Sequence, residues 1–392
     1  MLHRTNTLYK EFWIFALLSI SVTLSCKDEG SSHSEEEEAY MADYESPDHH
    51  WGFINLEGKL VIEADFDDVG PFSEGIAAVN KNGKWGYINT TGEMIIEPVY
   101  KSAWAFHEGF ARVMPFDGPD QFINRTGKVM KADNWSAADD FSDGRARVKV
   151  GNSFGFVDTS GQLIIQPIYT RGWNFNNGLC VIEYQEKLGV INQKGDNLIP
   201  TEYDQIKKVS NGKILLCTKI NNAIAYDQAG KEIIKLPGSK MVDSNGDLIS
   251  VREGSNMYLL KLSDPEKKGT NYTNIIFLEE NLWAGKLDSG YVLLDRDGNQ
   301  MTTNYYKQIN KFYEGIAAYS KADYWGYLDT TGQELTEGVF GLAWDYKEGL
   351  ARAAFQDGIA FIDKNQKLAF YPPRGALDMR DFSEGFASVQ MQ

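Results

Sequence analysis

The strongest constraint on the fold is a repeated unit of about 34 residues that opens with an aromatic-glycine strand. Its clearest copies are WGFIN at 51–55, WGYIN at 85–89, FGFVD at 154–158 and WGYLD at 325–329. Weaker copies begin at residues 120, 188, 223, 257, 291 and 359, so each step between successive starts is 34 or 35 residues. A fixed period of this size is typical of a repeat array rather than of an ordinary globular domain.

Each unit predicts short antiparallel strands joined by tight turns. In residues 76–109, the runs IAAV and WGYIN are separated by the turn-forming segment NKNGK, and WGYIN and MIIEPVY flank TTGE. Residues 100–109 are then expected to cross to the next copy, with a possible short fourth strand near residues 104–106. Because no segment has a sustained 3.6-residue apolar period, the sequence predicts an all-β array of about ten three-stranded antiparallel meanders.

The glycine of each WG pair, such as Gly86, lies inside a predicted strand, which indicates close approach of a neighbouring backbone or ring. These motifs are similar to those of the WG-repeat family, also called KWG repeats. That family is built on W-G-[FY]-[IV]-[DN], then G-x-x-[IV]-I-x-P-x-[YF], then F-x-E-G-x-A-x-V. The resemblance spans residues 51–389 and is weakest between about 205 and 290, where Ala223 and Met257 replace the WG tryptophan. It implies no established catalytic residues.

The two ends of the array predict how it closes. The first unit begins at Trp51 and lacks a preceding EGxAxV strand, whereas FSEGFASVQMQ at 382–392 supplies such a strand. Pairing of these two segments would remove the open edges of the array, so we expect a propeller-like closed ring. An open β-solenoid or superhelix, or two smaller rings broken near residues 205–225, remain as alternatives.

The N-terminal residues precede the repeat domain, which we assign to residues 51–392. Residues 12–25, FWIFALLSISVTLS, have the length of a secretory hydrophobic region, and Cys26 follows directly. Residues 1–25 resemble a bacterial lipoprotein signal peptide, which implies lipidation of Cys26; the alternative is an ordinary secretory signal. Residues 26–50 are acidic and predict a flexible tether. Their Lys-Asp-Glu start resembles the signal that exports Bacteroidota lipoproteins to the outer face of the outer membrane, although a linker without an address is the alternative.

Motifs for enzymatic chemistry are absent from the array. The sequence has no HExxH, P-loop or nucleophile-elbow motif, so no catalytic residue, metal site or cofactor is predicted. A net charge of −16 argues against nucleic-acid binding. Trp104, Trp173 and Trp344 share one crossover position and are predicted to bind a ligand or partner, because aromatic side chains stack on sugars and anchor interfaces. The alternative is that they fill gaps between repeats.

These observations favour a non-enzymatic, surface-exposed lipoprotein of the outer membrane. Its repeat array would act as a protein-binding scaffold, as an accessory subunit of an outer-membrane transport or secretion assembly. The alternative in the binding class is glycan capture by the crossover tryptophans. A less favoured alternative is a hydrolase with carboxylates in a central channel.

Overall fold

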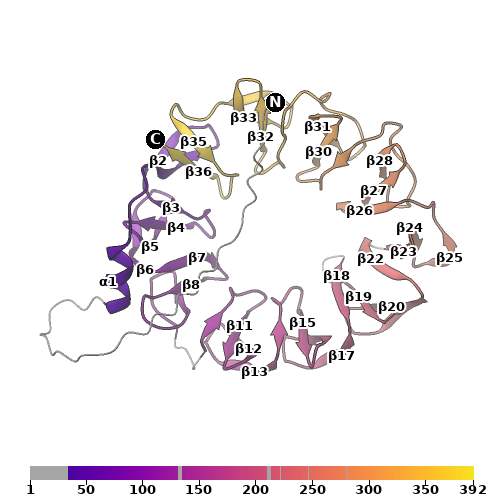
Figure 1. Ribbon diagram of the computed structural model, residues 1–392, viewed down its shortest axis with the longest axis horizontal. Helices are drawn as coiled ribbons and strands as arrows, with labels where there is room; N and C mark the ends of the chain where they lie inside the picture. Colours follow the sequence, from indigo (N-terminus) through magenta and orange to yellow (C-terminus); the bar gives the residue numbers. More distant parts are fainter. Residues whose placement is uncertain (1–33, 131–134, 210–212, 221, 246, 280) are drawn as a thin grey trace, which may run out of the picture.

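The computed structural model describes residues 34–130, 135–209, 213–220, 222–245, 247–279 and 281–392. Ten small antiparallel sheets follow one another around a common axis and form a ten-bladed β-propeller (Figure 1). The prediction of a closed all-β ring is therefore confirmed, and neither an open stack nor two smaller rings describes the molecule.

The blades are numbered here in chain order, and their strands are given from the axis outward. Blade 1 consists of β3 (Asp68–Val69), β4 (Ile76–Lys81), β5 (Lys84–Asn89) and β6 (Met94–Tyr100), and blade 2 consists of β7 (Ser102–His107), β8 (Phe110–Met114) and β9 (Gln121–Asn124). Blade 3 consists of β10 (Ala137–Ala138), β11 (Arg145–Val150), β12 (Ser153–Asp158) and β13 (Leu163–Tyr169), and blade 4 consists of β14 (Arg171–Gly172), β15 (Leu179–Tyr184), β16 (Lys187–Asn192) and β17 (Asn197–Tyr203). Blade 5 consists of β18 (Gln205–Val209), β19 (Ile214–Lys219), β20 (Asn222–Asp227) and β21 (Glu232–Pro237). Blade 6 consists of β22 (Lys240–Asn245), β23 (Leu248–Glu253), β24 (Asn256–Lys261) and β25 (Asp264–Lys268), and blade 7 consists of β26 (Asn274–Glu279), β27 (Leu282–Leu287) and β28 (Gly290–Leu294). Blade 8 consists of β29 (Gln308–Ile309), β30 (Ile316–Lys321) and β31 (Tyr324–Asp329), and blade 9 consists of β32 (Leu350–Phe355), β33 (Gly358–Asp363) and β34 (Leu368–Phe370). Blade 10 consists of β35 (Ala376–Met379), β36 (Phe386–Met391), β1 (His50–Asn55) and β2 (Leu60–Phe66).

A blade does not coincide with one sequence unit. It combines the crossover of one unit, which supplies a short strand near the axis, with the strands that follow. The fourth strand expected near residues 104–106 exists as β7, and blades 1, 3, 4, 5, 6 and 10 have four strands rather than the predicted three. The inner strands escape sequence analysis because several, such as β3 and β10, are only two residues long.

The tenth blade closes the ring with strands from both ends of the chain. Strand β36 pairs with β1 in an unbroken antiparallel register from His50↔Met391 to Asn55↔Phe386. The rings of Phe386 and Phe72 have centroids 4.6 Å apart, so the closing strand also packs against blade 1. The predicted pairing of the first WG strand with the last EGxAxV strand is therefore confirmed.

The EG motif forms a type I′ turn that links neighbouring blades. Glu74 has φ 55° and Gly75 has φ 75°, as the two central residues of such a turn require. The Glu74 carboxylate accepts a hydrogen bond from the amide of Gly109 in blade 2 (3.0 Å). In turn, the amides of Glu74 and Gly75 donate to the Glu384 carboxylate of blade 10, each at 2.7 Å.

The same carboxylate-to-amide link recurs between other neighbouring blades. It joins Glu108 to Gly144, Asp143 to Gly178, Glu314 to Glu348 and Gly349, and Glu348 to Gly385. The EG motif thus holds adjacent blades together, and two of its links join the closing blade to its two neighbours, blades 9 and 1.

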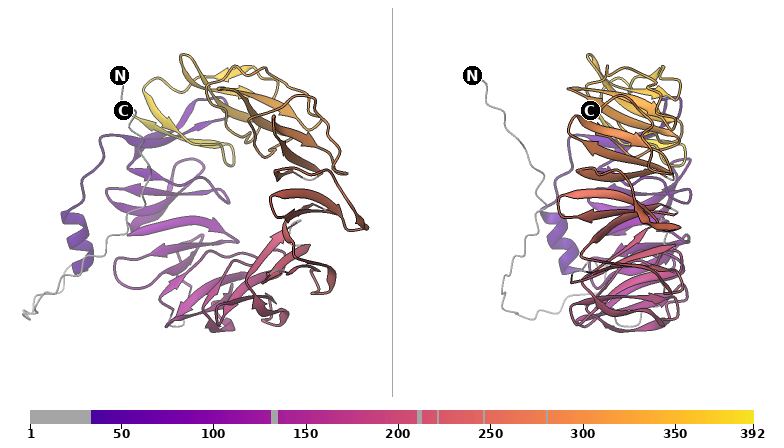
Figure 2. Two further views of the ribbon diagram at one scale, coloured as in Figure 1. Left: turned by 45° about the vertical axis from the view of Figure 1, so that its right-hand side comes forward. Right: turned by 90° about the vertical axis from the view of Figure 1, so that its right-hand side faces the viewer.

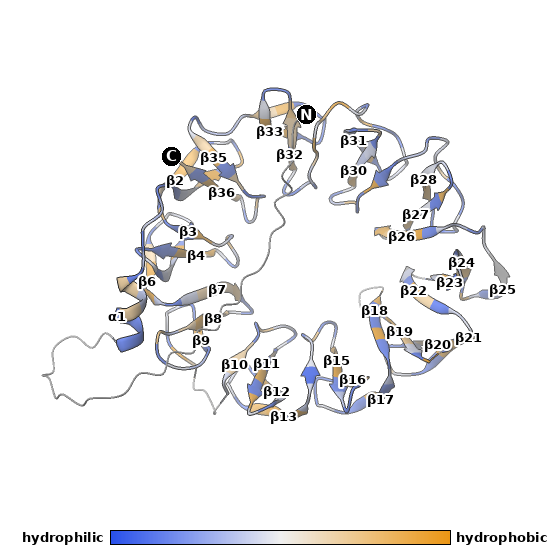
Figure 3. Ribbon diagram, in the orientation of Figure 1, coloured by the Kyte–Doolittle hydropathy of each residue, from blue (hydrophilic) through white to orange (hydrophobic). Residues whose placement is uncertain are grey.

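The hydrophobic core lies between blades. One cluster combines Ile76 and Tyr87 of blade 1 with Phe106 and Val113 of blade 2, all of which are buried. Hydrophobic colour is concentrated on the strands, and the connecting loops are mainly hydrophilic (Figure 3). Because each blade buries its apolar faces against its two neighbours, it depends on both of them for stability. Within the described residues, no helix is long and apolar enough to cross a membrane.

The flat faces of the ring differ in their turns. Strand β4 runs from the Glu74–Gly75 turn to the Asn82–Gly83 turn, so these turns lie on opposite faces. We call the faces the EG face and the NG face, and we include in each the equivalent turns of the other blades. The helix α1 (Glu35–Ala42) lies against one flat face of the ring (Figure 2, right). This is the NG face, because the ring of Tyr44, just after α1, covers Gly83.

The segment before the repeats is held by side-chain contacts with blades 1 and 2. Glu37 of α1 forms an ion pair with Lys84, and Tyr40 packs on Phe116 with ring centroids 5.4 Å apart. Tyr44 donates a hydrogen bond to Asp67 (2.7 Å). We expected residues 26–50 to be a flexible tether, and this expectation does not hold for Glu35–Ala42. The helix buries no residue, so its order comes from these contacts and from its Ser34 cap rather than from an apolar face of its own.

Candidate functional site at the ring seam

Trp104 lies on the inner strand β7, where neighbouring blades meet. Its carbonyl oxygen accepts a hydrogen bond from the hydroxyl of Tyr87, a buried residue of blade 1 (2.9 Å). The guanidinium carbon of Arg112 lies 3.6 Å from the centre of the Trp104 ring, a close cation–π contact. Arg112 also reaches Asp140 of blade 3, with Nε 3.3 Å from Oδ1. Trp104 therefore belongs to a contact that joins three blades.

Trp344 occupies the same place in blade 9. Its carbonyl oxygen accepts from the hydroxyl of Tyr327 in blade 8 (2.9 Å), and the guanidinium carbon of Arg352 lies 5.0 Å from the ring centre. Arg352 donates to Asp381 of blade 10 (2.8 Å) and to the carbonyl of Met379 (2.7 Å). We call the two arrangements, Trp104–Arg112–Asp140 and Trp344–Arg352–Asp381, the Trp–Arg–Asp clamps.

Trp173 differs from the other two crossover tryptophans. It is 45% exposed, and no cation–ring contact involves it among the described residues. The reason lies on the neighbouring strand, where Val181 stands at the position that Arg112 and Arg352 occupy in their blades. The structure thus places all three tryptophans on the inner rim, but only Trp173 presents a ring that no arginine covers.

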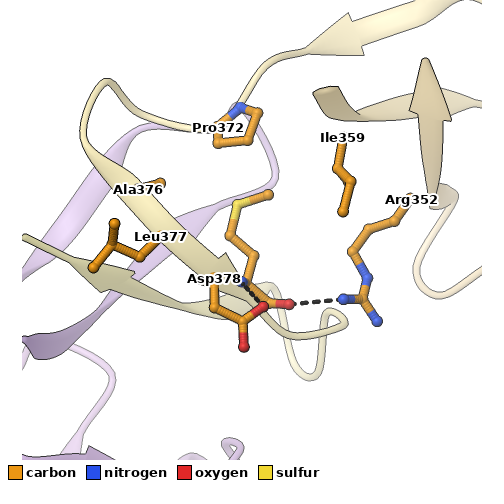
Figure 4. A pocket seen from close by; sticks show the side chains of 7 residues that line it. Arg352, Ile359, Pro372, Ala376, Leu377 and Asp378 are labelled. Carbon is orange, nitrogen blue, oxygen red and sulfur yellow. Dashed lines mark hydrogen bonds between the residues drawn. The ribbon is translucent and has the colours of Figure 1, made fainter. Parts of the chain in front are cut away.

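A groove opens beside the second clamp, between blade 9 and the closing blade 10. We call it the seam groove. It has a volume of about 200 Å³ and is lined by Arg352, Ile359, Pro372, Ala376, Leu377, Asp378 and Met379. Ile359 and Arg352 approach it from blade 9, and the residues from Pro372 onward line the opposite side (Figure 4). Ile359 is 40% exposed and Leu377 is 50% exposed, so the groove offers apolar surface to a partner.

The seam groove results from one departure from the repeat. Ile359 stands where the clearest units have the WG tryptophan, such as Trp51, which is buried against a neighbouring blade. The smaller isoleucine leaves space that an indole would fill. The replacement of the WG tryptophan by Ile359 is visible in the sequence, in the weak copy that begins at 359. Its effect on packing cannot be predicted without knowing that the WG tryptophan packs between blades.

A polar cluster replaces apolar packing in blade 8. The Glu334 carboxylate accepts hydrogen bonds from Tyr306 (2.9 Å), Tyr319 (2.9 Å), Asn304 (2.7 Å) and Lys321 (2.6 Å). Burial alone would raise the pKa of Glu334, but these hydrogen bonds outweigh it and hold that pKa below its ordinary value. In blade 1, Met94 occupies the equivalent position in contact with a buried apolar cluster.

We predict that Glu334 makes the stability of the ring dependent on pH. A depressed carboxyl pKa stabilises the fold above the unfolded-state value near 4.3, and this stabilisation is lost as the pH falls through the folded-state pKa. Between about pH 7 and pH 3, the free energy of unfolding should therefore fall more steeply for the wild type than for Glu334→Gln. Denaturant titrations across this range measure the difference, and parallel curves for the two proteins would contradict the prediction.

The described cysteines are buried, and the described carboxylates form no group placed to hold a metal ion. Cys180 and Cys217 are buried and unbridged, and burial raises the pKa of each thiol to about 12. Among the residues that the structure describes, no group of three or more His, Cys, Asp or Glu side chains is placed to hold a metal ion.

A ring of ten small antiparallel sheets built on one repeating strand motif is a repeat β-propeller. Six segments match the WG containing repeat, namely residues 51–85, 85–114, 122–153, 154–187, 189–222 and 325–358. These segments cover more than half of the chain, and the chain belongs to this family. The unmatched stretch 223–324 contains most of the region in which the sequence departs furthest from the repeat motif. A comparison with curated proteins finds no match.

Several solved structures are similar in outline. The computationally designed Ika8 protein has 14% identity over 74% of this chain and 93% of its own, with a TM-score of 0.35. A eukaryotic initiation factor has 10% identity over 67% and 84%, with a TM-score of 0.45. BamB from Moraxella catarrhalis has 10% identity over 87% and 98%, with a TM-score of 0.32. At such low values these similarities say nothing about a ligand or partner.

Proposed function

We propose that the protein is a non-enzymatic scaffold that binds another protein through the seam groove. The observation that carries this proposal is the pair of exposed apolar residues, Ile359 and Leu377, that line the groove from blade 9 and blade 10. The Trp344 clamp and the strand pairing of blade 10 hold the two walls in place. A binding surface that is already ordered loses little conformational entropy when a partner docks.

We further propose that Cys26 is lipidated and anchors the protein at the surface of the outer membrane. Cys26 lies outside the described residues, and the proposal rests on the resemblance of residues 1–25 to a lipoprotein signal. Ser34 lies eight positions after Cys26, so the chain can span at most about 28 Å between the anchor and α1. Because α1 lies on the NG face, this face would be held toward the membrane. The seam groove opens near the Gly358 turn on the same face, which suits a partner in an outer-membrane transport or secretion assembly.

Affinity purification from detergent-solubilised membranes tests the scaffold. Leu377→Asp should lose a stoichiometric partner that the wild type retains, because the new charge is placed in an apolar contact. Leu368→Asp is the matched control, since Leu368 is also 50% exposed but lies on the outer strand of blade 9. Equal recovery from both variants, or the absence of a stoichiometric partner in the wild type, would reject the proposal. In the same fractions, Cys26→Ser should release the protein from membranes, and continued membrane retention would reject lipidation.

A second candidate function is glycan binding through Trp173. Its exposed indole is the one crossover ring that no described arginine covers, and such rings stack on the faces of sugars. Retention in a polysaccharide affinity gel should then be lost in Trp173→Ala and kept in Tyr324→Ala, which removes an exposed ring of blade 8. Equal retention of the two variants would count against this function.

A further inference from the structure

A second cavity lies on the NG face, four blade positions away from the seam groove. Its volume is about 360 Å³, and it opens between blades 5 and 6. Its lining consists of Asp204, Gln205, Thr218, Ile220, Gly238, Ser239, Lys240, Arg252 and Gly254. The turns at Ile220 and Gly254 are equivalent to the Asn82–Gly83 turn, which places the mouth of the cavity on the face that carries α1.

Two cations, Lys240 and Arg252, line this cavity. Lys240 and Arg252 are direct partners in the register of β22 and β23, a placement in which like charges repel. Neither forms an ion pair with a described carboxylate, whereas Arg112 and Arg352 on the equivalent strands of blades 2 and 9 are each paired with an aspartate. The guanidinium of Arg252 donates a hydrogen bond to the sulfur of Met257 (2.9 Å), which is a weak acceptor.

Asp204 also lines the cavity, but its carboxylate and that of the neighbouring Glu253 have hydrogen-bond partners of their own. Asp204 binds the ammonium group of Lys187 (2.5 Å) and the amide of Ile220 (2.7 Å). Glu253 accepts hydrogen bonds from Ser239 (3.1 Å) and Tyr258 (2.9 Å).

The neighbouring blade adds to the positive charge. Residues 205–237, which make up blade 5, contain six lysines against one aspartate and one glutamate, although the whole chain has a net charge of −16. Two of these lysines, Lys207 and Lys219, form ion pairs with Asp243 and Glu202, which lie outside this range. The repeat here departs from its motif and is also locally basic. This charge attracts an anion to a cavity whose own two cations repel each other.

The other lining groups indicate the chemical class of the molecule that carries the anionic group. Gln205 and Thr218 can donate hydrogen bonds to hydroxyl or phosphate oxygens, and the Ser239 hydroxyl, which donates to Glu253, can accept one from a ligand hydroxyl. A Cβ atom at Gly238 or Gly254 would meet no atom within 4 Å, so both backbones are open to a ligand. A volume of about 360 Å³ lies within the range of small-molecule sites and exceeds the space that a bare phosphate needs.

We propose that this cavity binds a phosphate ester of a small polyol, with Lys240 and Arg252 holding the phosphate group. Bound phosphate turns the repulsion between the two side chains into two charge-assisted contacts. Gln205, Thr218 and Ser239 contact the polyol. The site does not involve the seam groove, so it stands or falls independently of the protein partner proposed there.

Ile220, at the rim of the cavity, is relevant to whether the phosphate belongs to a phospholipid or to a soluble ester. Ile220 is 76% exposed and has φ 54°, a left-handed conformation that is rare and strained for a β-branched side chain. It presents an apolar side chain beside the phosphate site on the face that the proposed lipid anchor holds toward the membrane. This arrangement suits the headgroup of a phospholipid, with Ile220 next to the acyl chains, and a soluble sugar or glycerol phosphate would use the same polar groups.

Calorimetric titration of the purified full chain in detergent with glycerol 3-phosphate tests the proposal. We expect saturable binding that glycerol does not reproduce and that Lys240→Gln or Arg252→Gln weakens at least tenfold. Lys235→Gln is the matched control, because Lys235 is exposed on β21 outside the cavity. Lys240 is also exposed, so its substitution tests the site even if Arg252→Gln lowers the unfolding temperature. Absence of saturable binding, equal binding of glycerol, or an equal loss in Lys235→Gln would overturn the proposal.

A lipid probe separates the two sources of the phosphate. If the ligand is a phospholipid, dihexanoyl phosphatidylglycerol should bind more tightly than glycerol 3-phosphate, and Ile220→Asn should remove only that gain. Asparagine tolerates positive φ, so this variant removes the apolar side chain without adding strain. Equal affinity for the two probes supports a soluble phosphate ester at the same site.

Discussion

Removal of residues 386–392 is expected to open the ring and convert the protein into larger, self-associating species. This deletion takes away β36, which pairs with β1 on one side and with β35 on the other. It also removes Ala387 and Val389 from the core, where both are fully buried. Burial of a valine side chain contributes about 1.5–3 kcal/mol by itself. The two strands left unpaired would present edges to which another chain can add.

Light scattering during size-exclusion chromatography measures the change in mass, and denaturant unfolding measures the loss of stability. Deletion of Gln392 alone is the control, because this residue is exposed and follows the paired strand. If the shorter chain kept the mass and unfolding midpoint of the control, closure by β36 would not be what holds the ring together.

Gly86→Ala should destabilise the ring by about 3 kcal/mol, the upper end of the cost of overpacking a core. Trp85 pairs with Tyr100 and Tyr87 with Ile96, so β6 bulges opposite Gly86. A Cβ atom at Gly86 would lie 2.5 Å from the carbonyl oxygen of Ile96. That atom is part of the backbone, so relief of the clash requires the bulge itself to move. The close approach predicted for the WG glycine is therefore confirmed.

Blade 5 supplies a natural comparison for this substitution. Ile224 replaces the WG glycine there, and β20 pairs with β21 without a bulge at that point, since Ala223 faces Leu236 and Ile224 faces Lys235. In this strand without a bulge, the exchange of the same two residue types at the preceding position, Ala223→Gly, should cost only about 0.5–1 kcal/mol, the backbone entropy of a glycine in a strand. Urea unfolding of the two variants compares these costs, and similar losses would show that the bulge does not require glycine.

The repeat period and the chain ends were enough to predict a closed all-β ring, because both follow from strand spacing and pairing. The seam groove could not be predicted in this way, because it depends on the size of Ile359 at a position whose packing only the structure reveals. Helix α1 was missed for a related reason. Its own residues lack an apolar face, and its contacts with Lys84 and Phe116 come from blades that follow it in the chain.

The crossover tryptophans show how far a repeat position predicts a role. Trp104, Trp173 and Trp344 are equivalent in sequence, but the residue eight positions later determines what surrounds each ring. Arg112 and Arg352 cover their tryptophans, whereas Val181 leaves Trp173 exposed. This signal was present in the sequence, but it could be recognised only once the pairing of inner and second strands was known.

The docking of α1 also determines how a mechanical load would enter the ring. A pull on an anchored N-terminus travels along the chain and meets the contacts of Glu37 and Tyr44 with blade 1 before it reaches β1. These contacts would bear the load first and would shield the strand pairing behind them. The pairing of β1 with β36, on which closure depends, therefore bears tension only after the helix has been detached.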